Sequence, residues 1–130
     1  MDARLAAQRW AETWATAWIA KDAEAVASLY AKDAAFRSQP FRELQDPRTY
    51  AEWAFSEQDD AECWFGTPVV DGNRATVEYW AVVSFEGRDE TIAGIAVIKF
   101  DDDGLVAEQR DYWNAQDGRH EAPEGWAART

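Results

Sequence analysis

The stretch RATVEYWAVVSFEGRDETIAGIAVIKFDDDGLVAEQRDYWNA (residues 74–115) decides the fold of this chain. Apolar and polar residues alternate through it with a period of two, which is typical of β-strands. The hairpin-type turns EGRD (86–89) and DDDG (101–104) divide it into three strands. A fourth strand-like segment, ECWFGTPVV (62–70), precedes it and ends at the turn pair Asp71-Gly72. We therefore predict a meander of four sequential antiparallel strands in this half of the chain.

The N-terminal half has a helical period instead. A tryptophan recurs at every fourth position of residues 10–18, in an alanine-rich segment that lacks glycine and proline, which indicates one apolar helix face. Two more helices are predicted after the N-cap residues Asp22 and Asp46, the first of them continuing to Tyr30. The segment KDAAFRS (32–38) between them is predicted to be a short strand.

These elements predict an α+β fold, in which a curved, mainly antiparallel sheet wraps around three N-terminal helices. A chain of 130 residues has the size of one domain with a single core. We assign residues 1–117 to this domain and expect residues 118–130 to form a C-terminal tail, because the tail has turn residues and no regular period.

Composition excludes several classes of function. The net charge of −12 argues against binding of nucleic acid or anionic membranes, because both need a cationic surface. No apolar segment has the length of a membrane span and the N-terminus lacks a signal-peptide pattern, so we expect a cytoplasmic protein. Cys63 is the only cysteine, and no histidine-rich set or glycine-rich phosphate loop occurs. We therefore expect neither a metal nor a cofactor.

Aromatic residues are abundant, with eight tryptophans, four tyrosines and six phenylalanines. A small domain has a limited core volume, so this many large rings more readily line a cavity than fill an interior. The alternative for each ring is ordinary core packing. The residues that we expect to line a pocket for an apolar small molecule are Trp14, Trp18, Phe36, Tyr50, Trp53, Trp64, Trp80 and Trp113.

Two segments carry a resemblance to a known superfamily. AETWATAWIAKDAEAVASLYAKDAAFRSQPF (11–41) resembles the opening of nuclear transport factor 2-like proteins, and GIAVIKFDDDGLVAEQRDYWNA (94–115) resembles their closing hairpin. The resemblance covers residues 5 to 117 and is nearest to the SnoaL-like, polyketide cyclase-type branch. It implies a cone-shaped sheet. This fold hosts isomerases, hydrolases, dehydratases and binding proteins, so it does not by itself imply one activity.

The resemblance also points to particular residues. Ketosteroid isomerases resemble the chain around FRSQP, but they have an aspartate general base where Ser38 stands. Limonene epoxide hydrolases and SnoaL-type cyclases resemble the last strand, and their catalytic aspartate aligns with Asp111. The hydrolases also have an Arg-x-Asp pair on an earlier strand, where this chain has Glu78 and Trp80 instead.

The residues themselves favour Asp111 as an acid/base group. Asp111 alternates with Ala107 and Trp113 on the strand face that we assign to the pocket. A carboxylate among tryptophans loses hydration, so its pKa should rise toward a range that is useful for proton transfer. The alternative is an aspartate in a structural ion pair with Arg37, Arg42 or Arg110.

Two further polar residues are weaker candidates. Glu78 shares a strand face with Trp80 and is a possible second acid/base group, the alternative being a glutamate in water. Ser38 is a candidate hydrogen-bond donor to a ligand oxygen, and a bond within its own turn is the alternative. We expect His120 to be exposed in the tail and Cys63 to be a packed, unreactive thiol.

Two functions from different classes follow. The first is an acid/base isomerase, cyclase or hydrolase that acts on an apolar small molecule through Asp111. The second is a non-catalytic small-molecule-binding or dimerisation module of the same fold. We also predict a homodimer, because the strands have apolar residues on both faces. The residues expected on the outer, dimer-forming face are Tyr79, Ala81, Val83, Phe85, Ile95 and Val97.

Overall fold

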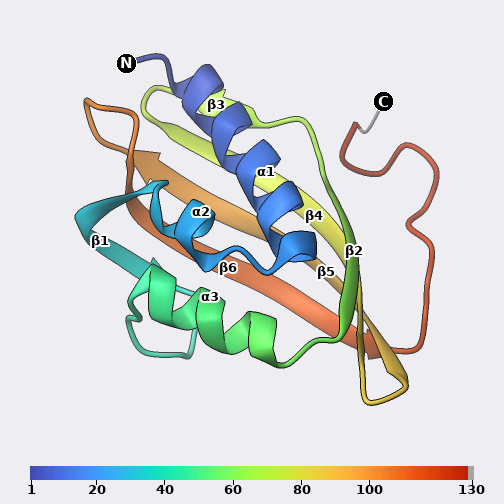
Figure 1. The fold of residues 1–130 in the computed structure, drawn as a ribbon. Helices are drawn as coiled ribbons and strands as arrows, with labels where there is room; N and C mark the ends of the chain where they lie inside the picture. Colours follow the sequence, from blue (N-terminus) through green and yellow to red (C-terminus); the bar gives the residue numbers. More distant parts are fainter. Residues whose placement is uncertain (129–130) are drawn as a thin grey trace.

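The computed structural model describes residues 1–128. These residues form three α-helices, six strands and one turn of 3-10 helix (Figure 1). The elements are α1 (Ala3–Ala20), α2 (Ala23–Ala27), β1 (Tyr30–Arg37), α3 (Pro47–Ser56), β2 (Asp60–Phe65), β3 (Val69–Asp71), β4 (Arg74–Phe85), β5 (Arg88–Phe100), β6 (Val106–Asp117) and η1 (Trp126–Ala128). The predicted α+β class, with three helices before the meander, is confirmed.

The strands form one curved sheet in the order β1-β6-β5-β4-β2, with β3 also paired to β4. All pairs within the meander are antiparallel, as predicted, whereas β1 lies parallel to β6 and makes the sheet mixed. The single strand predicted at residues 62–70 is wrong, because β2 and β3 are separate strands on the same edge of β4. Pro68, which has no backbone N–H for a ladder, lies in the break between them.

The predicted helix starts are confirmed by their caps. The side chains of Asp22 and Asp46 accept hydrogen bonds from the backbone N–H groups of Ala25 and Thr49. The second helix is shorter than predicted, because α2 ends at Ala27 and Tyr30 already belongs to β1. Pairing with β6 takes over at this point, where the backbone N–H of Val106 donates to the carbonyl of Leu29.

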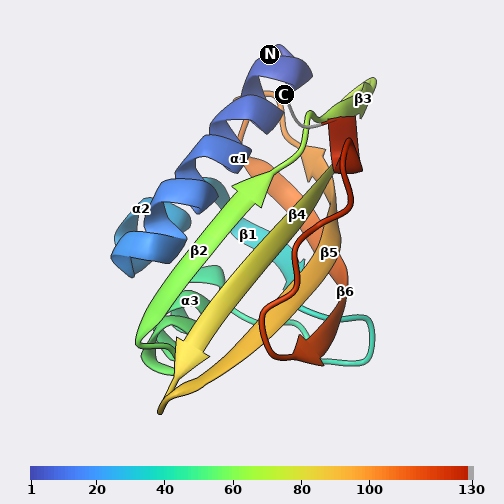
Figure 2. The same ribbon diagram turned by 90° about the vertical axis from the view of Figure 1, so that its right-hand side faces the viewer.

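All three helices lie on one face of the sheet (Figures 1 and 2). The tryptophan face of α1 points toward the sheet, and Trp10 is 1% exposed. The cross-strand register shows which side chains of the sheet point toward α1, because paired residues share a face. Val77, Ala96 and Asp111 form one inward row across β4, β5 and β6.

This register overturns our assignment of the faces of β4. Tyr79, Ala81 and Val83 point toward the helices rather than to a dimer interface, and Glu78 and Trp80 point away from them. Both faces of β4 carry apolar residues, so alternation alone did not distinguish the inner face from the outer one.

The tail explains why the outer face is apolar at this point. Residues 118–128 run across the outside of the sheet, opposite the helices (Figure 2). Trp126 packs edge-on against Trp80 with ring centroids 5.8 Å apart, and the Trp80 indole N–H donates to the carbonyl of His120. Thr91 is buried beneath this crossing, and its hydroxyl donates a hydrogen bond to the carbonyl of Gly118.

None of the helices in the described part of the chain has the length and apolar character that a membrane span requires.

Candidate active site

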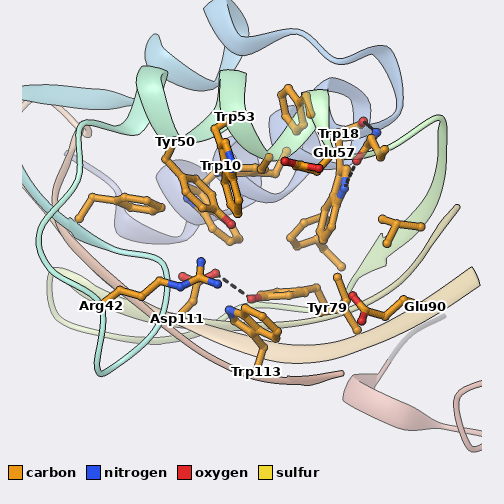
Figure 3. A pocket seen from close by; sticks show the side chains of 18 residues that line it. Trp10, Trp18, Arg42, Tyr50, Trp53, Glu57, Tyr79, Glu90, Asp111 and Trp113 are labelled. Carbon is orange, nitrogen blue, oxygen red and sulfur yellow. Dashed lines mark hydrogen bonds between the residues drawn. The ribbon is translucent and has the colours of Figure 1, made fainter. Parts of the chain in front are cut away.

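A cavity of about 190 Å³ lies between the helices and the concave face of the sheet (Figure 3). Its wall is mainly aromatic. Polar side chains gather at two ends: Arg42 and Asp111 at one, and Glu57 and Glu90 at the other (Figure 3). Glu57 and Glu90 are exposed, whereas Arg42 and Asp111 are half-buried.

Asp111 projects from β6 into the cavity and is held by two hydrogen bonds. The Tyr79 hydroxyl donates to Oδ2 at 2.7 Å, and the Gln109 amide Nε2 donates to Oδ1 at 2.8 Å. Each carboxylate oxygen keeps a lone pair, so Asp111 can still accept a proton from a bound molecule.

Gly94 makes the bond from Tyr79 possible. It lies on β5 between Tyr79 on β4 and Trp113 on β6. A Cβ atom at Gly94 would stand 2.7 Å from the Tyr79 hydroxyl oxygen and 2.7 Å from the Trp113 Cβ. The missing side chain therefore leaves room for the Tyr79 ring to cross β5 and reach Asp111.

Gln109 lies behind Asp111 and its orientation is fixed by donors from other elements. The indole N–H of Trp10 donates to Gln109 Oε1 at 2.9 Å, and the Tyr30 hydroxyl donates to the same oxygen at 2.5 Å. Two donors at Oε1 require the amide nitrogen to be on the other side, where it faces Asp111. Helix α1 and strand β1 thus determine that Asp111 receives a donor from Gln109.

No arginine among the described residues forms an ion pair with Asp111, so the alternative of an aspartate–arginine ion pair is wrong. Arg110 points to the outer face and donates to the Tyr112 hydroxyl. Arg37 donates to the backbone carbonyl of Arg42, and Arg42 donates to the Ser38 hydroxyl.

The pKa values in the site depend on this lack of a compensating charge near Asp111. Burial raises the pKa of Asp111 from 3.8 to about 7, against the opposing effect of the bonds from Gln109 and Tyr79. Burial first, and then the negative charge of Asp111, raise the pKa of Tyr50 to about 12. Near neutral pH the site therefore contains one carboxyl group with both protonation states populated, beside phenols that stay protonated.

Six of the predicted pocket residues line the cavity: Trp14, Trp18, Phe36, Tyr50, Trp53 and Trp113. Trp53 forms part of its rim and is 52% exposed. Trp64 and Trp80 are paired across β2 and β4 and lie on the outer face, so their placement in the pocket is wrong.

Glu78 lies on that outer face too, and a pairing with Asp111 is excluded by the intervening sheet. Ser38 is 2% exposed and donates to Gln45 Oε1 at 2.6 Å, so the local turn bond is the one that forms.

Several residues of the site were not predicted. Gln109 shares a strand face with Asp111 two positions away, so its proximity was available from the alternation. Tyr79 was missed because we had assigned it to the outer face of β4. Arg42 lies in the irregular connection between β1 and α3, which has no period that could show where its side chain points.

No group of three or more His, Cys, Asp or Glu side chains that could hold a metal occurs within residues 1–128. Cys63 packs beneath α1, where its thiol donates to the carbonyl of Ala15, and burial raises its pKa to about 12. The thiol therefore stays protonated and unreactive at neutral pH.

The chain matches the sequence profile of the SnoaL-like domain over residues 9–109. It belongs to the SnoaL-like family. The structure of SalBIII, an epoxide hydrolase/cyclase-like enzyme with a role in pyran ring formation in the polyether salinomycin, is similar with a TM-score of 0.74 and 15% identity over 87% of this chain and 93% of that one. No match was found among curated proteins.

Two further solved structures are similar to this SnoaL-like protein. A type 2 hexachlorocyclohexane dehydrochlorinase, LinA, has a TM-score of 0.71 and 13% identity over 94% of both chains. An LEH-like epoxide hydrolase of M. tuberculosis has a TM-score of 0.64 and 18% identity over 86% of this chain and 82% of that one. At these identities the likeness shows the shared fold and no particular reaction.

Proposed function

We propose that this SnoaL-like protein is an enzyme that performs acid/base chemistry on an apolar small molecule, with Asp111 as the proton-transferring group. The observation that carries the proposal is a carboxyl group in an aromatic cavity that has hydrogen-bond donors and no cationic partner among the described residues. A structural carboxylate at such a depth would be paired with a cation. Isomerisation, cyclisation and hydrolysis all need a group of this kind.

The geometry gives each residue a part in the reaction. Ionised Asp111 takes a proton from the bound molecule, and Tyr79 and Gln109 keep both carboxylate oxygens in place while the proton moves. Protonated Asp111 then returns the proton to a second atom of the same molecule. A pKa of about 7 makes both steps accessible near neutral pH. The tryptophans of the wall exclude water and bind the apolar part of the molecule.

A generic probe tests the base without knowledge of the natural substrate. A base removes the C3 proton of 5-nitrobenzisoxazole, the N–O bond breaks as the nitrile forms, and a coloured cyanonitrophenolate is released. We expect the protein to accelerate this elimination, with a rate that rises with pH and reaches half its maximum near pH 7. Asp111→Asn should return the rate to that of the buffer.

Glu78→Gln is the matched control, because it makes the same carboxyl-to-amide change on the opposite face of the same sheet. It should leave the rate unchanged. Equal rates for the wild type and Asp111→Asn would contradict the proposal.

The second candidate is a non-catalytic binding module. One observation favours it: both oxygens of Asp111 already accept a hydrogen bond within the protein, as they would in a purely structural role. A protein that binds small molecules in this cavity and shows no Asp111-dependent elimination would fit this candidate.

We also propose a homodimer through the outer face of the sheet, with a different set of residues from the one first expected. Ile95 and Val97 remain on this face, and Tyr112 is 44% exposed beside them. Phe41, which lines a groove on the same face, is fully exposed. Contact with a second copy would remove this apolar surface from water.

A further inference from the structure

Arg42 is the one cationic side chain in the cavity wall among the described residues, and no carboxylate within ion-pair distance neutralises it. This is unexpected in a chain that has 25 acidic residues and 13 Lys and Arg. A half-buried guanidinium without a carboxylate loses hydration and gains little in return, so its position needs an explanation.

The chain holds Arg42 firmly in this position. Arg37 Nη1 donates to the backbone carbonyl of Arg42 at 2.6 Å. The Ser38 hydroxyl gives its proton to Gln45 Oε1, which leaves its oxygen free to accept from Arg42 Nη1 at 3.0 Å. The backbone and the side chain of Arg42 are therefore both fixed by the turn that follows β1.

Two indole rings lie close to the guanidinium of Arg42. Its central carbon is 5.4 Å from the centroid of the Trp113 ring and 5.9 Å from that of Trp53. The Trp113 ring is itself fixed, because its N–H donates to the carbonyl of Ser38 at 2.7 Å. The guanidinium thus lies against two indole rings, one of which has a fixed orientation.

The Arg42 guanidinium lines the cavity and has more N–H donors than its partners in the protein use. A guanidinium has five N–H groups, and within the protein Arg42 uses them on the Ser38 hydroxyl and on the Tyr50 hydroxyl. The positive charge of Arg42 lowers the pKa of Tyr50, whereas the negative charge of Asp111 raises it, so Tyr50 lies near both groups. Figure 3 shows Arg42, Asp111 and Tyr50 at the same end of the cavity.

We propose that Arg42 is a specificity-determining residue that binds a carbonyl-type oxygen of a neutral, otherwise apolar ligand. The inference deepens the proposed small-molecule function and rests on it. The planar fork of N–H donors matches an oxygen that accepts two hydrogen bonds, and the half-buried setting strengthens those bonds. The ligand is neutral because three carboxyl groups line the same cavity, Asp111, Glu57 and Glu90, and these repel an anion.

Acetophenone and ethylbenzene form a matched pair of probes, since they have the same carbon skeleton and differ by the carbonyl oxygen. Their dissociation constants can be measured by ligand-observed NMR. We expect the wild type to bind acetophenone about tenfold more tightly than ethylbenzene, the size of effect expected for a charge-assisted hydrogen bond. In Arg42→Met this ratio should fall to about one, with ethylbenzene affinity within about twofold of the wild type.

Arg110→Met is the control, because it removes an arginine that adjoins Asp111 in sequence and faces the outside. It should keep the tenfold ratio. If Arg42→Met does not give a cooperative thermal melt, Arg42→Lys replaces it; this variant keeps the charge and loses the fork, and its ratio should fall about threefold or more.

An unchanged ratio in the folded Arg42 variant would overturn the inference, as would no binding of either probe to the wild type. If benzoate binds more tightly than acetophenone, the conclusion that the ligand is neutral is wrong. The elimination assay is independent of these results. A ratio that depends on Arg42 without any Asp111-dependent elimination would support a binding site and refute the enzyme.

Discussion

Replacement of Asp111 by asparagine should have an effect on stability that changes with pH in a defined direction. The folded protein binds the Asp111 proton more tightly than the unfolded chain, because the pKa is about 7 in the fold and near 3.9 in an unstructured chain. The free energy of unfolding of the wild type therefore falls as the pH rises from about 4 to about 7, and is constant above that. An amide does not titrate, so Asp111→Asn lacks this loss.

The size of the effect follows from the two pKa values. Three pKa units at 1.36 kcal/mol each give a total of about 4 kcal/mol, of which about 2.5 kcal/mol is lost between pH 5 and pH 8. The amide can accept from Gln109 through its oxygen, but it cannot reproduce both bonds of the carboxylate. That constant penalty does not depend on pH, so it cancels in the comparison between the two pH values.

Urea unfolding of the wild type and Asp111→Asn at pH 5 and pH 8 measures this quantity. The variant should gain about 2.5 kcal/mol relative to the wild type on going from pH 5 to pH 8. The variant Glu78→Gln, which removes a carboxyl group on the outer face, should show a much smaller change. A relative stability of Asp111→Asn that is constant, or that falls as the pH rises, would refute the argument that an uncompensated carboxyl group lies in the cavity.

Three other changes test parts of the site and the assembly. Gln109→Leu should raise the pKa of Asp111 and move the midpoint of the pH–rate profile for 5-nitrobenzisoxazole upward, because one donor to the carboxylate is lost; an unmoved midpoint would show that Gln109 does not act on Asp111. Gly94→Ala should reduce the rate of this elimination by about tenfold or more, because the added Cβ collides with Tyr79, and a full rate would contradict the part given to that residue. Ile95→Lys on the outer face should convert a dimer into a monomer in sedimentation velocity, and a monomeric wild type would refute the homodimer.

The fold was predictable from this sequence because its signals are local and repeated. The signals are the change from helical period to alternation, the hairpin turns, and the N-caps at Asp22 and Asp46. Each predicts where an element begins or ends, and the structure has an element boundary at each of them. The two errors in element bounds have different causes. Pro68 interrupts the ladder between β2 and β3, and at Tyr30 pairing with the distant strand β6 overrides the local helical pattern.

The site was predictable only where alternation on one strand sufficed. Asp111 and Trp113 were placed correctly, because they share a face of β6. Glu78, Trp64 and Trp80 were not, because β4 is apolar on both sides and the tail covers the outer one. Which face is the inner one depends on contacts between distant segments, and no single strand carries that information.

The most direct test of proton transfer by Asp111 is an NMR titration of its carboxyl carbon in protein labelled with ¹³C-aspartate. The signal is assigned as the one that is absent from Asp111→Asn. We predict a single transition with a midpoint near pH 7, because burial without a cationic partner among the described residues disfavours the charged form. A midpoint near or below 4 would show that the carboxylate is solvated or ion-paired, and would contradict its proposed part in proton transfer.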